Sequence, residues 1–206
     1  MYETREQWLQ AALNLIRFHL RTSASVEVPK DTQVSCGLAG GRIGAKRIGE
    51  CWSTTCSADG KTEIFISPVL SDITGKQGVL ATLVHEAIHA AIGTEHGHKA
   101  PFRAAAEAAG LEGKMTATTA SDALMDTIWT WSGVLGDYPH SALIPGNRKK
   151  QTTRLIKACC AQCGFVTRLT QKWIDKIGAD SLQCVDSSCG GSLKIAGSDD
   201  DEGEGE

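Results

Sequence analysis

The sequence has no uninterrupted apolar stretch that approaches the roughly 18 residues needed for a membrane helix. Its first twenty residues alternate apolar and charged side chains and offer no small-residue cleavage site, so they do not resemble a secretory signal. We therefore expect a cytoplasmic protein. Thiols stay reduced in that compartment, so the eight cysteines favour metal binding over disulfides where their spacing allows it.

Two further absences narrow the function. The chain has no internal repeat of useful length, which argues against a repeat architecture. Its glycine-rich stretch 37–44 lacks the lysine and the spacing of a phosphate-binding loop, which argues against nucleotide binding. What remains is a 206-residue chain with an ordinary hydrophobic fraction of 41%, a length that suits one medium domain and one small one.

Charge is distributed unevenly along the chain, although the total is only −3. Residues 146–196 are basic, whereas residues 197–206 carry six carboxylates and no apolar side chain. We expect an α+β domain at residues 1–145, a polar linker at 146–153, a small β unit at 154–196 and a disordered acidic tail at 197–206.

Apolar periodicity and turn residues place the regular elements of the larger domain. The pattern predicts an amphipathic helix over 3–21, strands over 48–53 and 62–67, and helices over 75–92, 102–109 and 121–133.

The helix predicted over 75–92 carries the motif His85-Glu86-Ala87-Ile88-His89 near its end. Residues four apart project from the same face of a helix, so His85 and His89 can bind one Zn²⁺. Glu86 lies one step around the helix, where it can accept a proton from a water on the metal. The alternative is that the two histidines have no function. Because the residues around them are apolar, the histidines would then be buried polar groups without a partner, which costs free energy. The motif therefore predicts a catalytic zinc site.

A catalytic zinc site normally has three protein ligands, so a third is needed. The candidates downstream are Glu95, His96, His98 and Glu107. One known arrangement places the third histidine ten residues after the first. That position is Glu95 in this chain, so the arrangement does not apply. A glutamate from the following helix would be Glu107, and a loop after the helix could fold a histidine back over the metal.

The segment HEAIHAAIG, followed by Gly97-His98 and then Phe102, resembles the SprT-like metallopeptidases. In that family a third histidine follows HExxH and is itself followed four residues later by Phe or Trp. The resemblance implies a zincin-like peptidase domain over 1–145 with His85, His89 and His98 as zinc ligands and Glu86 as the base. His96 remains an alternative, because family members often place glycine directly after the ligand.

The strand and proline of TEIFISP also look like phage and bacterial members of this family. Zincin-type peptidases pair an extended substrate with an edge strand, and residues 62–67 are our candidate for that strand. Some SprT-like relatives act on proteins bound to DNA, which implies a DNA-associated protein substrate. Tyr138 and His140 are either oxyanion-stabilising groups near the cleft or, as we favour, a turn fixed by the proline between them.

A second cysteine-rich pattern follows the linker. Cys160 and Cys163 form a CxxC pair, and Cys184 and Cys189 form a second pair after a spacer long enough for strands. This layout predicts a closed, structural four-cysteine zinc ribbon, with Cys159 as an alternative to Cys160. Its net charge of +6 with the linker fits a nucleic-acid partner as well as it fits simple solubility. We interpret Cys36, Cys51 and Cys56 as small buried hydrophobes.

The sequence thus predicts a zinc metalloendopeptidase with one catalytic and one structural Zn²⁺. The competing prediction is a nucleic-acid-binding protein whose zincin domain is no longer catalytic.

Overall fold

The computed structural model describes residues 2–38, 47–144 and 155–195, and these fall into two compact units, unit 1 before the division between residues 147 and 148 and unit 2 after it. The predicted linker 146–153, the acidic tail 197–206 and most of the glycine-rich stretch lie outside the described residues. Within them the chain is α+β, with five α-helices and three small sheets. No helix in these ranges combines the length and hydropathy required to cross a bilayer.

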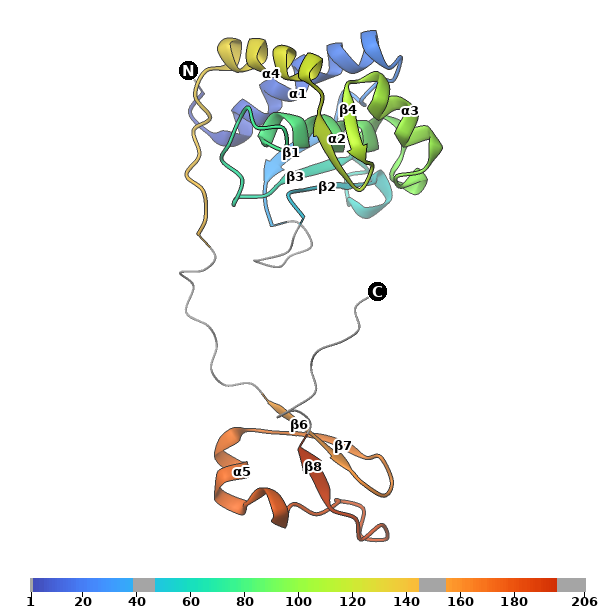
Figure 1. Cartoon of the computed structure of the whole chain (residues 1–206), viewed down its shortest axis with the longest axis vertical. Coiled ribbons are helices and arrows are strands. Elements are labelled where there is room, and N and C mark those ends of the chain that lie inside the picture. Colours follow the sequence, from blue (N-terminus) through green and yellow to red (C-terminus); the bar gives the residue numbers. More distant parts are fainter. Residues whose placement is uncertain (1, 39–46, 145–154, 196–206) are drawn as a thin grey trace. The chain divides into compact units, whose positions relative to one another are not determined.

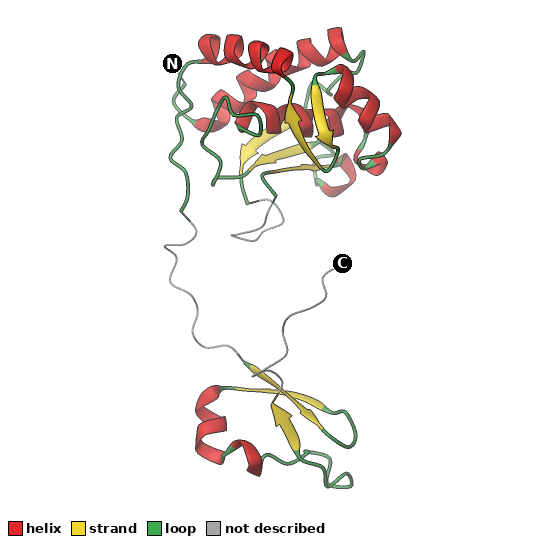
Figure 2. Ribbon diagram, in the orientation of Figure 1, coloured by secondary structure: helices red, strands yellow, loops and turns green. Residues whose placement is uncertain are grey.

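Unit 1 contains four helices and two sheets (Figures 1 and 2). In chain order its elements are α1 (Arg5–Ser23), β1 (Gln33–Cys36), β2 (Gly49–Trp52), β3 (Glu63–Ile66), α2 (Val79–Ile92), α3 (Ala100–Ala108), β4 (Leu111–Lys114), β5 (Ala117–Ala120) and α4 (Asp122–Leu135).

Helix α1 confirms the predicted amphipathic helix and supplies one wall of the core. The Thr4 side chain accepts a hydrogen bond from Gln7 N and so caps its first turn. Its apolar stripe, which includes Trp8 and Leu13, is fully buried. The stripe packs against α2, and α4 in turn packs on α1 (Figure 1).

Helix α2 runs through the middle of unit 1, between α1 and the sheet formed by β1, β3 and β2. It is buried on almost every side from Val79 to Ala90. The sequence predicts a start at residue 75, four residues too early. Asp72 explains the difference, because its side chain caps Thr74 and Gly75 and its carbonyl accepts from Val79 N at 2.7 Å. These contacts hold residues 72–78 in a turn.

The three-stranded sheet has the order β1-β3-β2, with β1 parallel and β2 antiparallel to β3. The expectation that residues 62–67 form an edge strand is therefore wrong, because β3 is the central strand. Ile64 and Ile66, two residues apart on one face of this strand, are fully buried in the core. The edge strand that lines the cleft described below is β2. Strand β1, at the other edge, was not predicted.

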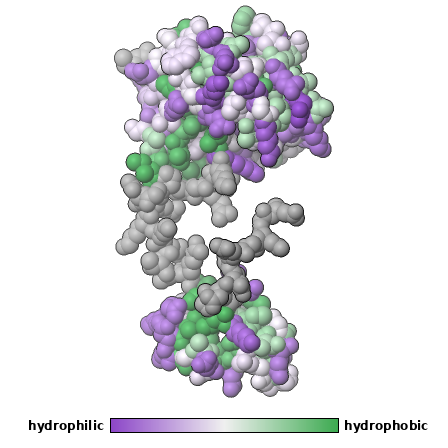
Figure 3. Space-filling view, in the orientation of Figure 1, coloured by the Kyte–Doolittle hydropathy of each residue, from purple (hydrophilic) through white to green (hydrophobic). Residues whose placement is uncertain are grey.

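The segment after α4 fastens the end of unit 1 onto α1. Tyr138 packs on Trp8 with ring centroids 4.8 Å apart. His140 Nε2 donates to Pro68 O at 3.0 Å, and its Nδ1 accepts from the Arg5 guanidinium at 3.3 Å. Figure 3 shows hydrophobic residues gathered over this extended segment, where Leu143 N donates to Pro68 O.

Unit 2 is a small sheet of order β7-β6-β8 with one short helix. Its elements are β6 (Ile156–Cys160), β7 (Val166–Leu169), α5 (Gln171–Ile177) and β8 (Leu193–Ile195). The spacer between the two cysteine pairs does contain a strand, β7, but it also contains helix α5, which was not predicted. The buried hydrophobic cluster contains only five residues: Ala158, Cys160, Ile174, Leu182 and Leu193. A core this small cannot by itself offset the entropy of ordering the unit.

Candidate functional site

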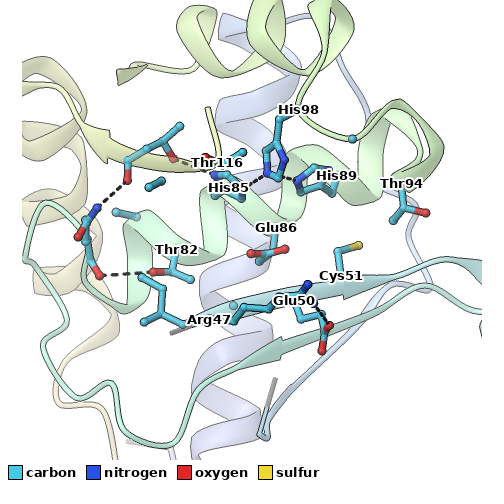
Figure 4. A pocket seen from close by; sticks show the side chains of 17 residues that line it. Arg47, Glu50, Cys51, Thr82, His85, Glu86, His89, Thr94, His98 and Thr116 are labelled. Atoms are coloured by element: carbon cyan, nitrogen blue, oxygen red, sulfur yellow. Dashed lines mark hydrogen bonds and ion pairs between the residues drawn. The ribbon is translucent and has the colours of Figure 1, made fainter. Parts of the chain in front are cut away.

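The HExxH motif lies in the last turns of α2 and faces a cleft of about 720 Å³. One wall of the cleft is the edge strand β2, and the other is the β4–β5 hairpin, which contributes residues 116–118. Figure 4 shows His85 and His89 projecting from the same side of the helix, as the four-residue spacing predicts, and Glu86 directed toward β2.

His98 completes a cluster of three imidazoles. Its Nε2 atom lies 3.1 Å from Nε2 of His85 and 3.2 Å from Nε2 of His89 (Figure 4). Three nitrogens bound at about 2.0–2.1 Å in tetrahedral geometry would be about 3.3 Å apart. The spacing of the cluster therefore fits one Zn²⁺.

The turn between α2 and α3 explains why His98 reaches the cluster. Gly93 ends α2 with φ +95°, and Gly97 follows a short 3-10 turn with φ +50°. Side chains with a Cβ rarely adopt these angles, so the two glycines permit a reversal that turns the chain back toward α2. His96, inside the 3-10 turn, is exposed and lies 3.9 Å from Glu95.

Phe102 supports the three histidines from behind. It is fully buried on α3, and its ring centroid lies 4.7, 4.4 and 5.0 Å from those of His85, His89 and His98. The spacing of four residues from His98 to Phe102 thus has a packing reason, because the Phe102 ring packs against all three imidazoles. Glu107, the other candidate ligand, is exposed and near Arg103 instead.

The electrostatics of the cluster favour neutral imidazoles. Burial, together with the two neighbouring histidines, lowers the pKa of His85 to about 3. Burial and His98 lower the pKa of His89 to about 4, and burial lowers the pKa of His98. Neutral imidazole is the form that binds metal ions. The cluster is therefore ready to bind a cation near neutral pH.

Glu86 is buried beside the histidines and against β2. Burial and the nearby carboxylate of Glu50 raise its pKa to about 8, although Arg47 acts in the opposite direction. A Cβ at Gly49 would lie 2.6 Å from Glu86 Oε1, so only glycine at that position leaves room for the carboxylate. A divalent cation in the cluster would favour the ionised form of Glu86.

Several residues of the cleft were not found from the sequence. Arg47 and Glu50 form an ion pair of 2.7 Å at its rim, and the Thr118 hydroxyl lies 2.8 Å from His85 Nδ1. No local pattern marks them, because they come from segments far from the motif in sequence. Cys51 also lines the cleft, and burial, with Glu86, raises its pKa to about 12. That thiol stays protonated and is not an activated nucleophile.

Other predicted residues lie elsewhere. Tyr138 and His140 are not among the residues that line the cleft, so an oxyanion role for them finds no support and their contacts are structural. Cys36 and Cys51 pack against the core only partly buried, and Cys56 is exposed. The prediction that all three cysteines are buried is wrong, because Cys36 and Cys51 lie on the edge strands of the sheet and Cys56 lies in a 3-10 turn with no buried residue.

The four predicted cysteines of unit 2 form a second cluster. Sγ atoms are 3.6 Å apart in the pairs Cys160–Cys189 and Cys163–Cys184, too far for a disulfide and close to the separation of thiolates on one Zn²⁺. Backbone N–H groups of Cys163 and Gln162 lower the pKa of Cys160 to about 6. Cys159 lies outside this cluster, with its Sγ near Gly164 O.

Comparisons with protein-family models, curated proteins and solved structures found no match to this chain. The function is therefore argued from the two clusters, a group of three histidines and a group of four cysteines, each of which could hold a metal ion.

Substitution of the third histidine tests the cluster directly. We expect His98→Ala to lower the zinc content of the purified chain by one ion, because two imidazoles alone bind Zn²⁺ weakly. His96→Ala, two residues away and exposed, should leave the zinc content unchanged. Elemental analysis after dialysis measures both variants. The reverse result would move the ligand to His96.

Proposed function

We propose that this protein is a zinc-dependent endopeptidase of the SprT-like type. The observation that supports the proposal best is the convergence of His85, His89 and His98 beside the buried carboxylate of Glu86, in a cleft open to solvent. Three histidines leave one tetrahedral position of a zinc ion for water or substrate. Zn²⁺ in this site would polarise a peptide carbonyl and lower the pKa of a water.

Glu86 would act as the base in this reaction. It accepts a proton from the attacking water and donates it to the leaving amine. Burial raises the pKa of Glu86, which makes the protonated form accessible for that second step. Its position between the histidines and β2 places it next to any chain that lies along the edge strand.

Strand β2 can hold an extended substrate. Ile48 O accepts from Ser67 N at 2.9 Å, so residues 48 and 67 form a hydrogen-bonded pair. In an antiparallel ladder these pairs alternate, and the N–H and C=O groups of Gly49 and Cys51 therefore point to the free edge. A peptide that pairs with this edge would run past the three histidines.

A proteolysis assay tests the proposal. The purified chain should cleave an unfolded protein such as casein, lose that activity in a chelator and regain it with Zn²⁺. If a chain that holds two zinc ions cleaves neither casein nor DNA-bound histones, the peptidase proposal is wrong.

We further propose that unit 2 recruits the protein to DNA. Alternation along the strands places Lys157, Arg168 and Lys194 on the outer face of the sheet, opposite the buried Ala158. Lys157 lies directly opposite Arg168, a like-charge pair that destabilises a sheet unless an anion neutralises it. The three strands contain no acidic residue. This face is suited to a phosphate backbone.

Charge reversal on this face should weaken DNA binding. We expect Lys157→Glu to lower DNA affinity several-fold. The slope of log affinity against log salt concentration should also become shallower, by about the amount that one phosphate contact contributes. Lys172→Glu makes the same charge change on α5, away from the sheet, and should have a smaller effect. Fluorescence anisotropy at several salt concentrations measures both. Equal losses would indicate only a general effect of net charge.

This face also favours a second candidate function, a nucleic-acid-binding protein without catalysis. That function predicts DNA binding by the wild-type chain, no cleavage of any protein substrate, and no loss of DNA affinity in the His98→Ala variant.

A further inference from the structure

We infer that Thr118 is a positioning residue of the histidine cluster, which holds the His85 ring in the orientation and tautomer that zinc binding requires. The inference rests on the proposed zinc site and adds to it a residue from the opposite wall of the cleft. Thr118 lies on β5, and its Oγ1 is 2.8 Å from His85 Nδ1.

The direction of this hydrogen bond follows from the geometry of the cluster. His85 Nε2 faces the other two histidines, so it is the nitrogen that would bind zinc and it must then carry no proton. The proton of the neutral ring is consequently on Nδ1, and Nδ1 donates to the Thr118 hydroxyl oxygen. Such a bond fixes the ring and increases the basicity of the ligating nitrogen.

Thr118 is itself held in place from the N-terminal end of α2. Its carbonyl accepts a hydrogen bond from Gln77 Nε2 at 3.4 Å, and Ala120 N donates to Lys76 O at 2.8 Å. The carbonyl of Gln77 in turn accepts from the Thr82 hydroxyl (Figure 4). The hairpin is thus fastened to the turn that leads into α2, the helix that carries His85, which limits the freedom of the hydroxyl relative to the ring.

The other two histidines lack such a support. All three rings pack on Phe102, but among the described residues no hydrogen bond to Nδ1 of His89 or His98 is present. His85 alone therefore depends on a side-chain hydrogen bond for its orientation. Removal of that bond should weaken the metal site more than an equal change elsewhere on the hairpin.

The test compares zinc affinities of full-length variants by competition with a chelator, with the four-cysteine site filled first. The His98→Ala variant serves as the reference, because its zinc binding should come from the four-cysteine site alone. Thr118→Val keeps the shape of the side chain but removes the hydroxyl, and we expect it to weaken zinc binding at the histidine site about 10- to 100-fold. Thr118→Ser restores a hydroxyl and should bind zinc within a few-fold of the wild type.

Thr119→Val is the matched control, because Thr119 lies on the same strand and faces the other side of the hairpin. It should leave zinc affinity unchanged. Wild-type affinity in Thr118→Val would overturn the inference, and so would an equal loss in Thr118→Ser, since that variant keeps a hydroxyl and the effect would then not depend on the hydroxyl. A wild-type chain that binds only the ribbon zinc would overturn the proposed function as well.

Discussion

Replacement of Glu86 by Gln should abolish peptide cleavage and leave both zinc ions in place. Glutamine has nearly the same shape as glutamate but cannot accept a proton from water. General-base catalysis contributes about 10²- to 10⁴-fold to a rate, and we expect a loss in that range. Casein cleavage followed by gel electrophoresis, with zinc content measured on the same sample, checks the prediction.

The environment of Glu86 makes this substitution informative. The carboxylate is buried, and that burial, with Glu50, already raises its pKa to about 8, so a neutral amide introduces no new penalty of desolvation. The fold of unit 1 should therefore be preserved, which circular dichroism can verify. Cleavage at the wild-type rate would show that Glu86 is not the base.

Loss of one ribbon cysteine should unfold unit 2 and spare unit 1. Cys163→Ser removes one of the four converging thiols, and we expect the zinc content to fall from two ions to one. Structural zinc contributes about 10–16 kcal/mol to small domains of this kind. The five buried hydrophobic residues of unit 2 cannot compensate for that loss, whereas unit 1 keeps its own, much larger core. Limited proteolysis of this variant should then give new cuts within residues 155–195 and none within unit 1.

Cys159→Ser is the control for this prediction. Cys159 is adjacent to a cluster member in sequence, but alternation along β6 turns its side chain to the other face of the sheet. Its Sγ lies 3.6 Å from Gly164 O and outside the four-sulfur cluster. This variant should keep both zinc ions and a folded unit 2. Loss of zinc in Cys159→Ser would favour Cys159 over Cys160 as the ligand that pairs with Cys163.

The two variants separate the roles of the two units. Glu86→Gln should lose cleavage and keep DNA binding, while Cys163→Ser should lose DNA binding and keep the histidine cluster. If both variants lost both properties, the units would depend on each other in a way that their separate cores do not suggest.

The local features of the site could be predicted from the sequence. His85, Glu86 and His89 lie on one helix, where a four-residue spacing determines which side chains share a face. The CxxC pair and its partner pair likewise specify a four-thiol cluster through spacing and glycine-containing turns. The amphipathic helix α1 follows from its apolar stripe. These inferences need only the geometry of neighbouring residues.

Features that depend on distant segments could not be predicted in this way. The family resemblance selects His98 over His96, but the physical reason appears only in the structure, where the turn made by Gly93 and Gly97, with Phe102 behind it, brings His98 to the cluster. Residues 62–67 have the alternation of any half-buried strand, so their central place in the sheet became apparent only with β1 and β2 on either side.

The sequence by itself determined the chemistry available to this protein: two histidines and a carboxylate on one helix, and four thiols in two pairs. Tertiary structure decided which third histidine joins them, which strand borders the cleft and that Thr118, 33 residues from His85, supports its ring. The physical reason is that helix periodicity and turn conformations are local, whereas strand order and hydrogen bonds between remote segments depend on the packing of the whole domain.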